Sequence, residues 1–187
     1  DIAGLPVAAA LISAAGLEEK STFFYNNNVG QANNRSQVER MRESAAFAES
    51  LGVKTHDYQA DLKSTTEKLV KIFNSGEKIL VLEGGRMEMT YRALALTDPS
   101  NLRNITLVSH STANENYNKG GTRTWSDLKR DFFEVNFVSI PDQNGGFNSK
   151  QWQWLDSTSD PLLKKVRQLM QNAEQKVNDP SDAGMHF

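Results

Sequence analysis

The sequence predicts an α/β fold with an open, mainly parallel, doubly wound sheet and helices on both faces. Apolar runs of strand length alternate with helix-like segments along the chain of 187 residues. The central run, Ile79 to Leu82, passes through Glu83 into Gly84-Gly85 and then directly into a helix-like pattern, which is a βα unit of such a sheet. No repeat or long linker interrupts this alternation. We therefore expect a single domain that covers residues 1–187.

The chain begins with a predicted helix, Val7 to Ala15, with Pro6 near its first turn and Gly16 at its end. No strand precedes this helix in the sequence. Since the fold class starts with a strand, the chain reads as if its first strand had been cut away. The expected sheet therefore has five strands and lacks a sixth.

The remaining elements follow from composition and periodicity. Apolar, β-branched and aromatic runs predict strands at Thr22–Tyr25, Val53–Tyr58, Ile79–Leu82, Ile105–Val108 and Val135–Ile140. Apolar residues at helical spacing predict helices at Ser36–Leu51, Thr65–Phe73, Met87–Leu96, Trp125–Phe133 and Leu162–Val177. Glycine or proline follows most of these segments, as is typical of element ends.

Composition excludes several classes of function. The formal net charge is −2, which gives no electrostatic reason to bind nucleic acid or an anionic membrane, and no apolar run reaches transmembrane length. The chain has 0 cysteines, so it has no disulfide framework and no thiolate metal site. The absence of cysteine suits a periplasmic or secreted protein, with the cytoplasm as the alternative. A homo-oligomer is compatible with all of these features.

Polar loops follow successive predicted strands, and they are Asn26–Asn28, Gly84–Glu88, His110–Asn118 and Asp142–Gly146. In an open parallel sheet these loops share one edge, so their side chains converge there. Asp1 joins this edge because its helix begins where a preceding strand would end, and Asp182 joins it if the tail returns. Clustered oxygen ligands of this kind suit a hard cation such as Ca²⁺.

Four motifs carry a family resemblance. They are Asp1-Ile-Ala-Gly-Leu-Pro-Val-Ala-Ala-Ala-Leu, Leu82-Glu-Gly-Gly-Arg-Met-Glu-Met, Glu115-Asn-Tyr-Asn118 and Asp179-Pro-Ser-Asp182-Ala. In this order they resemble the metal motif, the central turn, the substrate-binding segment and the C-terminal metal segment of the nucleoside hydrolases. The branch that the chain resembles is the group of nucleoside hydrolase-related proteins that bacteria encode beside polysaccharide-degrading enzymes.

The resemblance implies a nucleoside hydrolase-like fold and a Ca²⁺-assisted N-glycosidase. By the same resemblance Asp1 is a bidentate metal ligand, Asp182 is the distal metal ligand, and Glu88 ligates by its carbonyl or its carboxylate. The implied substrate is a nucleoside or another small sugar derivative. The residues expected to contact it are Asn116, Asn118, Glu115, Asn28 and Trp152.

The chain also departs from the family. The first Asp of the opening motif, which is the family's catalytic base, is absent from this sequence. Ser181 stands where the family has a His, and Arg86 stands where it has a Pro. The catalytic residue is therefore unassigned. A non-catalytic carbohydrate-binding protein that keeps the cleft but has lost the base is the alternative, and a flavodoxin-like regulatory domain is less favoured.

Structural roles compete with the predicted functional ones. Asp1 is a favoured helix cap, Asp182 lies in a tail, and Glu88 suits the positive end of a helix dipole. Trp152 and Trp154 differ by two positions, so one ring can stack on a sugar while the other packs into the core. These alternatives stay open at the level of sequence.

Overall fold

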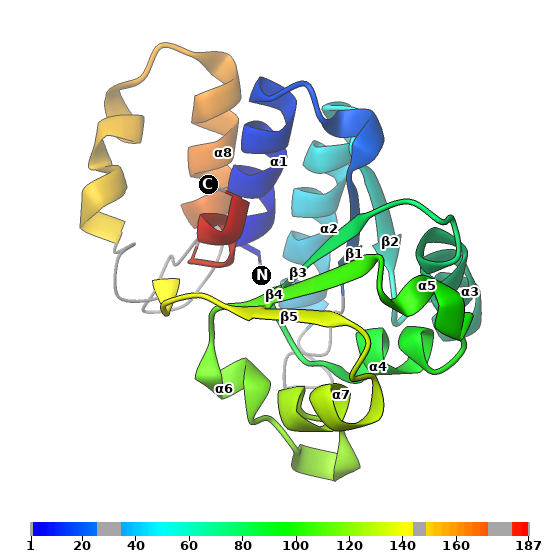
Figure 1. Ribbon diagram of the computed structural model, residues 1–187. Coiled ribbons are helices and arrows are strands. Elements are labelled where there is room, and N and C mark those ends of the chain that lie inside the picture. The colour runs from blue at the N-terminus through cyan, green and yellow to red at the C-terminus, as the bar shows by residue number, and fades with distance from the viewer. Residues whose placement is uncertain (1, 26–34, 144–148, 172–180, 187) are drawn as a thin grey trace. The chain divides into compact units, whose positions relative to one another are not determined.

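The computed structural model describes residues 2–25, 35–143, 149–171 and 181–186 (Figure 1). Contacts divide the chain into two compact units. The central unit is Ala60–Asp142, and the discontinuous unit combines Asp1–Gln59 with Gln143–Phe187. Each unit contains its own sheet of parallel strands.

The central unit is built on a three-stranded sheet. Its strands are β3 (Ile79–Glu83), β4 (Ile105–Ser109) and β5 (Asn136–Ser139). They run parallel in the order β3-β4-β5, and the register pairs Glu83 with Ser109 and Ser109 with Ser139. The carboxyl ends of the three strands therefore meet at one edge, which we call the carboxyl edge.

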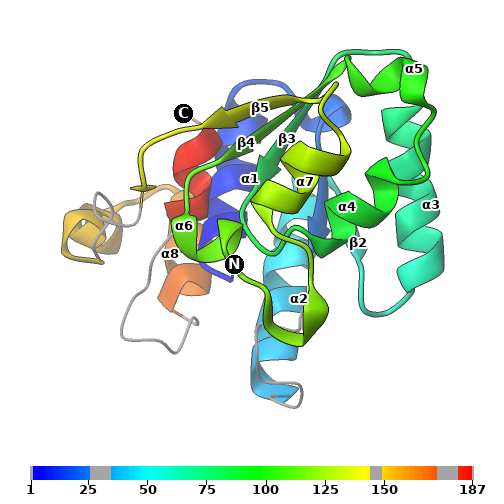
Figure 2. The same cartoon turned by 60° about the horizontal axis from the view of Figure 1, so that its bottom comes forward.

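Helices cover one face of this sheet (Figure 2). The helices of the central unit are α3 (Leu62–Phe73), α4 (Glu88–Leu94), α5 (Pro99–Leu102), α6 (Thr112–Glu115) and α7 (Trp125–Asp131), with a 3₁₀ turn η2 (Lys119–Gly121). The Trp125 ring of α7 meets the Phe137 ring of β5 edge to face, with 5.1 Å between the centroids. Because side chains alternate along a strand, Leu107, which pairs with Phe137, lies on this same covered face and is fully buried.

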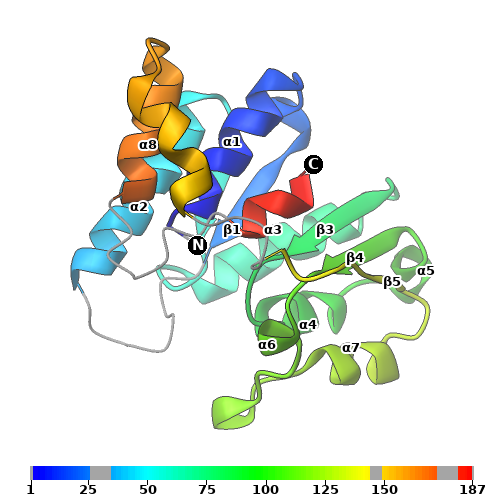
Figure 3. The same ribbon diagram turned by 90° about the vertical axis from the view of Figure 1, so that its left-hand side faces the viewer.

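The discontinuous unit combines two parallel strands with helices from both ends of the chain. Its elements are α1 (Gly4–Ala14), η1 (Glu18–Lys20), β1 (Thr22–Tyr25), α2 (Arg35–Ser50), β2 (Lys54–Asp57), η4 (Ser149–Ser157), α8 (Pro161–Gln171) and η5 (Ser181–His186). In Figure 3, α8 runs alongside α1 and α2, and it packs against both.

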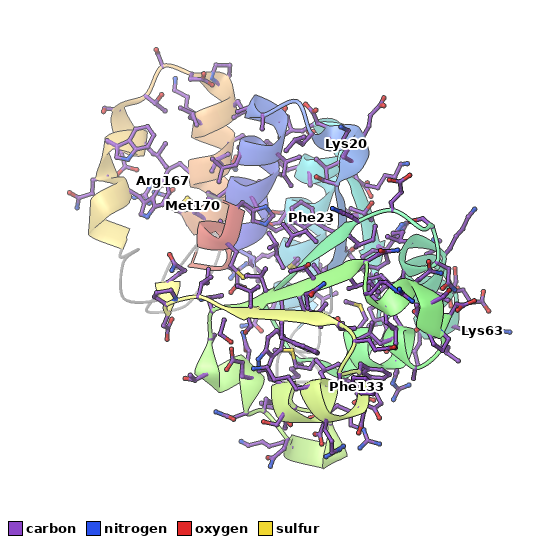
Figure 4. The ribbon with its side chains drawn as sticks, in the orientation of Figure 1. Lys20, Phe23, Lys63, Phe133, Arg167 and Met170 are labelled. Carbon is purple, nitrogen blue, oxygen red and sulfur yellow. The ribbon has the colours of Figure 1, made fainter. Side chains whose placement is uncertain are left out.

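One hydrophobic core joins elements from both ends of the chain in this unit. Val7 of α1, Phe47 of α2 and Leu169 and Met170 of α8 belong to one buried cluster, which Ala183 of η5 completes. The Arg167 guanidinium of α8 then ties η4 to this group through Asp156, with 2.6 Å between Nε and Oδ1 (Figure 4). Residues that are far apart in sequence therefore build one core.

The predicted α/β class with parallel strands is confirmed, and each of the five predicted strands is present within one or two residues of its expected bounds. Hydrogen bonds join these strands as a two-stranded and a three-stranded sheet. One continuous nucleoside hydrolase-like sheet and one domain over residues 1–187 stay predictions. The predicted last helix is observed as Pro161–Gln171, and its remainder lies outside the described residues.

Candidate functional site

The carboxyl edge of the central unit places a buried acid beside a buried hydroxyl. Glu83 ends β3 and is 5% exposed, while its register partner Ser109 ends β4 and is 0% exposed. Paired residues on neighbouring strands lie about 4.8 Å apart and point to the same face. Both side chains therefore lie on the face that α4 and α7 cover.

Burial dominates the chemistry of Glu83. It raises the pKa of this carboxyl from 4.5 to about 7, and a side-chain hydrogen bond with Thr90 of α4 lowers the pKa only in part. A carboxyl in an apolar environment loses the hydration that favours its charged form. Near neutral pH, Glu83 therefore exists in both its protonated and its ionised form.

Two polar atoms at this edge lack a protein partner. Glu83 Oε1 and Ser109 Oγ are buried and make no hydrogen bond with any residue that the structure describes. An unsatisfied buried polar atom costs about 1–3 kcal/mol, so native structures usually fill such positions with a water or a ligand. The two atoms belong to paired residues on adjacent strands.

A histidine and an aspartate follow the next two strands. His110 comes directly after β4, and its side chain is completely buried. Its Nδ1 lies 3.8 Å from Oδ1 of Asp142, which follows β5 and is about half exposed. Loops after neighbouring strands thus add an imidazole and a carboxylate to the carboxyl edge.

A network of cations, rings and carboxylates ties the loop after β4 to α4. Glu88 Oε1 accepts a hydrogen bond from Arg92 Nε at 2.8 Å, and its Oε2 accepts one from the Arg123 backbone N–H at 3.1 Å. The Arg123 guanidinium lies 4.7 Å above the Tyr91 ring. These contacts hold Arg123 against α4.

Glu88 lies at the start of α4, and two groups contact its carboxylate. It is the first residue of the helix, where an acid stabilises the positive end of the helix dipole. Its two carboxylate oxygens accept hydrogen bonds from Arg92 Nε and from the Arg123 backbone N–H. Glu88 as a metal ligand, by its carbonyl or its carboxylate, stays a prediction.

The other predicted metal ligands do not form a described site. Asp182 lies half-buried in η5 of the discontinuous unit, while Asp1 is outside the described residues. Within the described ranges, no group of three or more His, Asp or Glu side chains is arranged to hold a metal ion. The calcium ion therefore stays a prediction that depends on Asp1 and Asp182.

The predicted substrate-binding residues of the central unit share one loop. Glu115 ends α6, Asn116 follows it, and Asn118 precedes η2. Asn116 and Asn118 are exposed and flank Tyr117, which is partly buried. The loop follows β4, so these residues come after the same strand end as Ser109.

The remaining predicted contacts belong to the other unit or to undescribed positions. Trp152 lies in η4 and packs against the buried cluster of α1 and α8, whereas Trp154 is 55% exposed. Trp152 as a contact of the sugar stays a prediction. Asn28 lies outside the described residues.

Sequence reasoning missed Glu83 and Ser109 as functional candidates. The signal that could have revealed Glu83 is strand alternation, because it shares a face with Ile79 and Val81. A carboxyl on an otherwise apolar strand face is unusual and indicates a buried acid. Ser109 carries no such signal, since serine is common at strand ends.

Comparison with protein-family models, with curated proteins and with solved structures finds no match for this chain. In the part of the chain that the structure describes, every helix is too short or too polar to span a membrane.

Proposed function

We propose that the protein is a hydrolase-like α/β protein that binds a nucleoside or another small sugar derivative at the carboxyl edge of the β3-β4-β5 sheet. The observation that carries this proposal is the buried acid Glu83, whose pKa is raised to about 7 and whose Oε1 has no partner among the described residues. Ligands of open α/β sheets bind beyond the carboxyl ends of the strands. A sugar hydroxyl offers both a donor and an acceptor to Glu83 and Ser109.

Glu83 has the chemistry of a general acid for cleavage of a glycosidic bond. A carboxyl that titrates near the working pH can be protonated before the reaction and ionised after it. In an N-glycosidic substrate, Glu83 donates its proton to the leaving nitrogen as the carbon–nitrogen bond breaks. Water then bonds to the anomeric carbon, and the proton that this water loses restores the acid form of Glu83.

Three further side chains support this role. Ser109 Oγ orients the hydroxyl or the water that bridges to Glu83, because both side chains point to the same face. Asn116 and Asn118, on the loop after β4, supply exposed amides for the remaining sugar hydroxyls. No step depends on Ca²⁺.

A non-catalytic carbohydrate-binding protein is the second candidate. The carboxylate of Glu88, which accepts hydrogen bonds from Arg92 and from the Arg123 backbone, supports it, since the resemblance to nucleoside hydrolases implies a metal-assisted reaction. In this case Glu83 and Ser109 bind sugar hydroxyls and break no bond.

The test combines binding with turnover. Isothermal titration calorimetry measures the affinity for uridine and for ribose, and a reducing-sugar assay of the ribose released from uridine reports cleavage. We expect Glu83→Gln to lower the rate by about 10²–10⁴-fold, which is the usual contribution of acid–base catalysis. Glu77→Gln, an exposed acid just before β3, is the matched control and should keep the wild-type rate.

Three outcomes separate the candidates. Cleavage that Glu83→Gln abolishes and Glu77→Gln preserves supports the enzyme. Binding without cleavage supports the carbohydrate-binding protein. If wild-type protein neither binds nor cleaves these compounds, both candidates are refuted.

A further inference from the structure

Arg86 is a stacked cation beside the proposed site. It follows Gly84-Gly85 directly after β3, and its guanidinium carbon lies 3.9 Å from the centroid of the Tyr117 ring. The side chain is partly buried. The cation lies over the face of the ring, where a cation–π interaction restricts its position.

No described residue accepts a hydrogen bond from this guanidinium or forms an ion pair with it. The nearest acid in sequence, Glu88, is engaged by Arg92 and by the Arg123 backbone. Arg130, by contrast, is paired with both Asp127 and Asp131. Arg86 is therefore restricted in position, with its five donors available.

There is room for a ligand next to Arg86. A Cβ placed on Gly85 would meet no heavy atom within 4 Å, so the backbone beside Arg86 borders open space. Asn116 and Asn118 flank the ring on which Arg86 stacks, and both are exposed. The cation therefore lies between the loop after β3 and the loop that carries the proposed sugar contacts.

We infer that Arg86 binds an oxyanion group of the ligand, so that the ligand is an anionic sugar derivative. A fixed planar guanidinium binds phosphate or carboxylate through two parallel hydrogen bonds. The sugar part of this inference rests on the proposed function, whereas the oxyanion part rests on Arg86 and Tyr117 alone. Phosphate and carboxylate share the required chemistry, and the experiment distinguishes them.

The experiment is a calorimetric titration at fixed ionic strength. The probes are inorganic phosphate, ribose 5-phosphate, glucuronate and neutral ribose. We expect wild-type protein to bind ribose 5-phosphate or glucuronate at least about tenfold more tightly than ribose, because charge-assisted hydrogen bonds are the strong ones. The tighter of the two anionic sugars identifies the oxyanion.

Three variants test whether Arg86 causes the tighter binding of anionic sugars. Arg86→Gln should remove the advantage of the anionic sugar over ribose, and Arg86→Lys, which keeps the charge but not the planar fork, should retain only a small part of it. Arg103→Gln removes the same charge just before β4, at the amino end of the sheet, and should leave the advantage unchanged. Circular dichroism verifies that each variant is folded.

Several results would overturn the inference. Equal affinity of the wild-type protein for ribose and for both anionic sugars would contradict it. If Arg103→Gln loses as much of the advantage of the anionic sugar as Arg86→Gln does, the effect is one of general charge and the inference is also contradicted. If Arg86→Gln fails to fold, full retention of the advantage in Arg86→Lys counts against bidentate recognition. Binding of inorganic phosphate that depends on Arg86, without any binding of ribose or uridine, supports the oxyanion site and contradicts the proposed function.

Discussion

Glu83 links the stability of the fold to pH. Burial raises the pKa of its carboxyl from 4.5 in the unfolded chain to about 7 in the folded one. Between these two values the folded state holds a proton that the unfolded state has released. The free energy of unfolding therefore decreases as pH rises from 4.5 to 7 and stays at its lower level above 7.

Replacing Glu83 by glutamine removes this dependence. The amide stays neutral at every pH, so Glu83→Gln should be more stable than wild type at pH 8, by an amount on the order of 3 kcal/mol. Urea unfolding at pH 5, 6, 7 and 8 measures the difference between variant and wild type. This difference cancels the contribution of other groups, such as His186, whose pKa is lowered by burial.

The exposed acid Glu77 provides the control. Glu77→Gln should follow the wild-type pH dependence, because it leaves the buried carboxyl of Glu83 in place. A Glu83→Gln variant that keeps the full wild-type slope would show that Glu83 does not titrate in this range.

The role of a single side chain can be predicted from the sequence only where it depends on neighbouring residues in the chain. The position of Glu88 in the first turn of a helix follows from the sequence, whereas its contacts with Arg92 and Arg123 are seen only in the structure. Alternation cannot decide which of Trp152 and Trp154 packs inward, because that depends on where η4 meets α8. The burial of Glu83 depends likewise on α4, which lies over the end of β3.

The start of α7 depends on a capping box. Thr124 Oγ1 accepts a hydrogen bond from the Asp127 backbone N–H at 3.2 Å, and Asp127 Oδ2 accepts one from the Thr124 backbone N–H at 2.9 Å. Hydrogen bonds with Thr124, aided by Arg130, lower the pKa of Asp127 to about 2. This reciprocal pair satisfies donors that the first helical turn leaves free.

Thr124→Ala should therefore destabilise the protein. Loss of an N-cap hydroxyl typically costs about 1 kcal/mol, and urea unfolding at pH 7 measures the change. Thr124→Ser keeps the hydroxyl and should restore most of the lost stability. Equal destabilisation by alanine and serine would mean that the methyl group, not the cap, is what matters.

Strong periodicity explains which elements the sequence predicts. The strands with continuous apolar runs and the long helices with an inward stripe are found close to their expected bounds. The short helix α6 lies within the segment His110–Asn118 that the sequence predicts to be a polar loop, since a helix of 4 residues shows no repeating pattern.

Strand pairing is the feature that periodicity cannot provide. Periodicity identifies which side of an element is buried but not which other element covers that side. The return of residues 149–171 to the core of α1 is a contact between distant parts of the chain, and no local signal specifies it. The division into a central and a discontinuous unit is therefore seen only in the structure.

Leu169 tests the shared core of the discontinuous unit. It is fully buried in α8 within the cluster that contains Val7 and Phe47. Leu169→Ala should destabilise this unit by about 2–5 kcal/mol, because it leaves a cavity that the neighbours cannot fill. Native-state hydrogen exchange should show faster exchange in α1 and α8 together, as expected when two helices share one cooperative core.

Leu17 is the matched control for this change. Its side chain is 43% exposed and belongs to the same unit, so Leu17→Ala should change stability by less than about 0.5 kcal/mol. Faster exchange in α8 alone after Leu169→Ala would contradict a common core with α1.

The discontinuous unit also has a consequence for biosynthesis. A ribosome makes α1 long before α8, yet the two helices complete one core. The central unit, Ala60–Asp142, is continuous in sequence and has all of its own strands and helices once Asp142 has emerged. Because the chain emerges from its amino terminus, α1 can pack against α2 early, but the part of its apolar surface that α8 and η5 cover stays exposed while the central unit is made. This interval makes the nascent chain a natural client for a chaperone that binds exposed apolar helices.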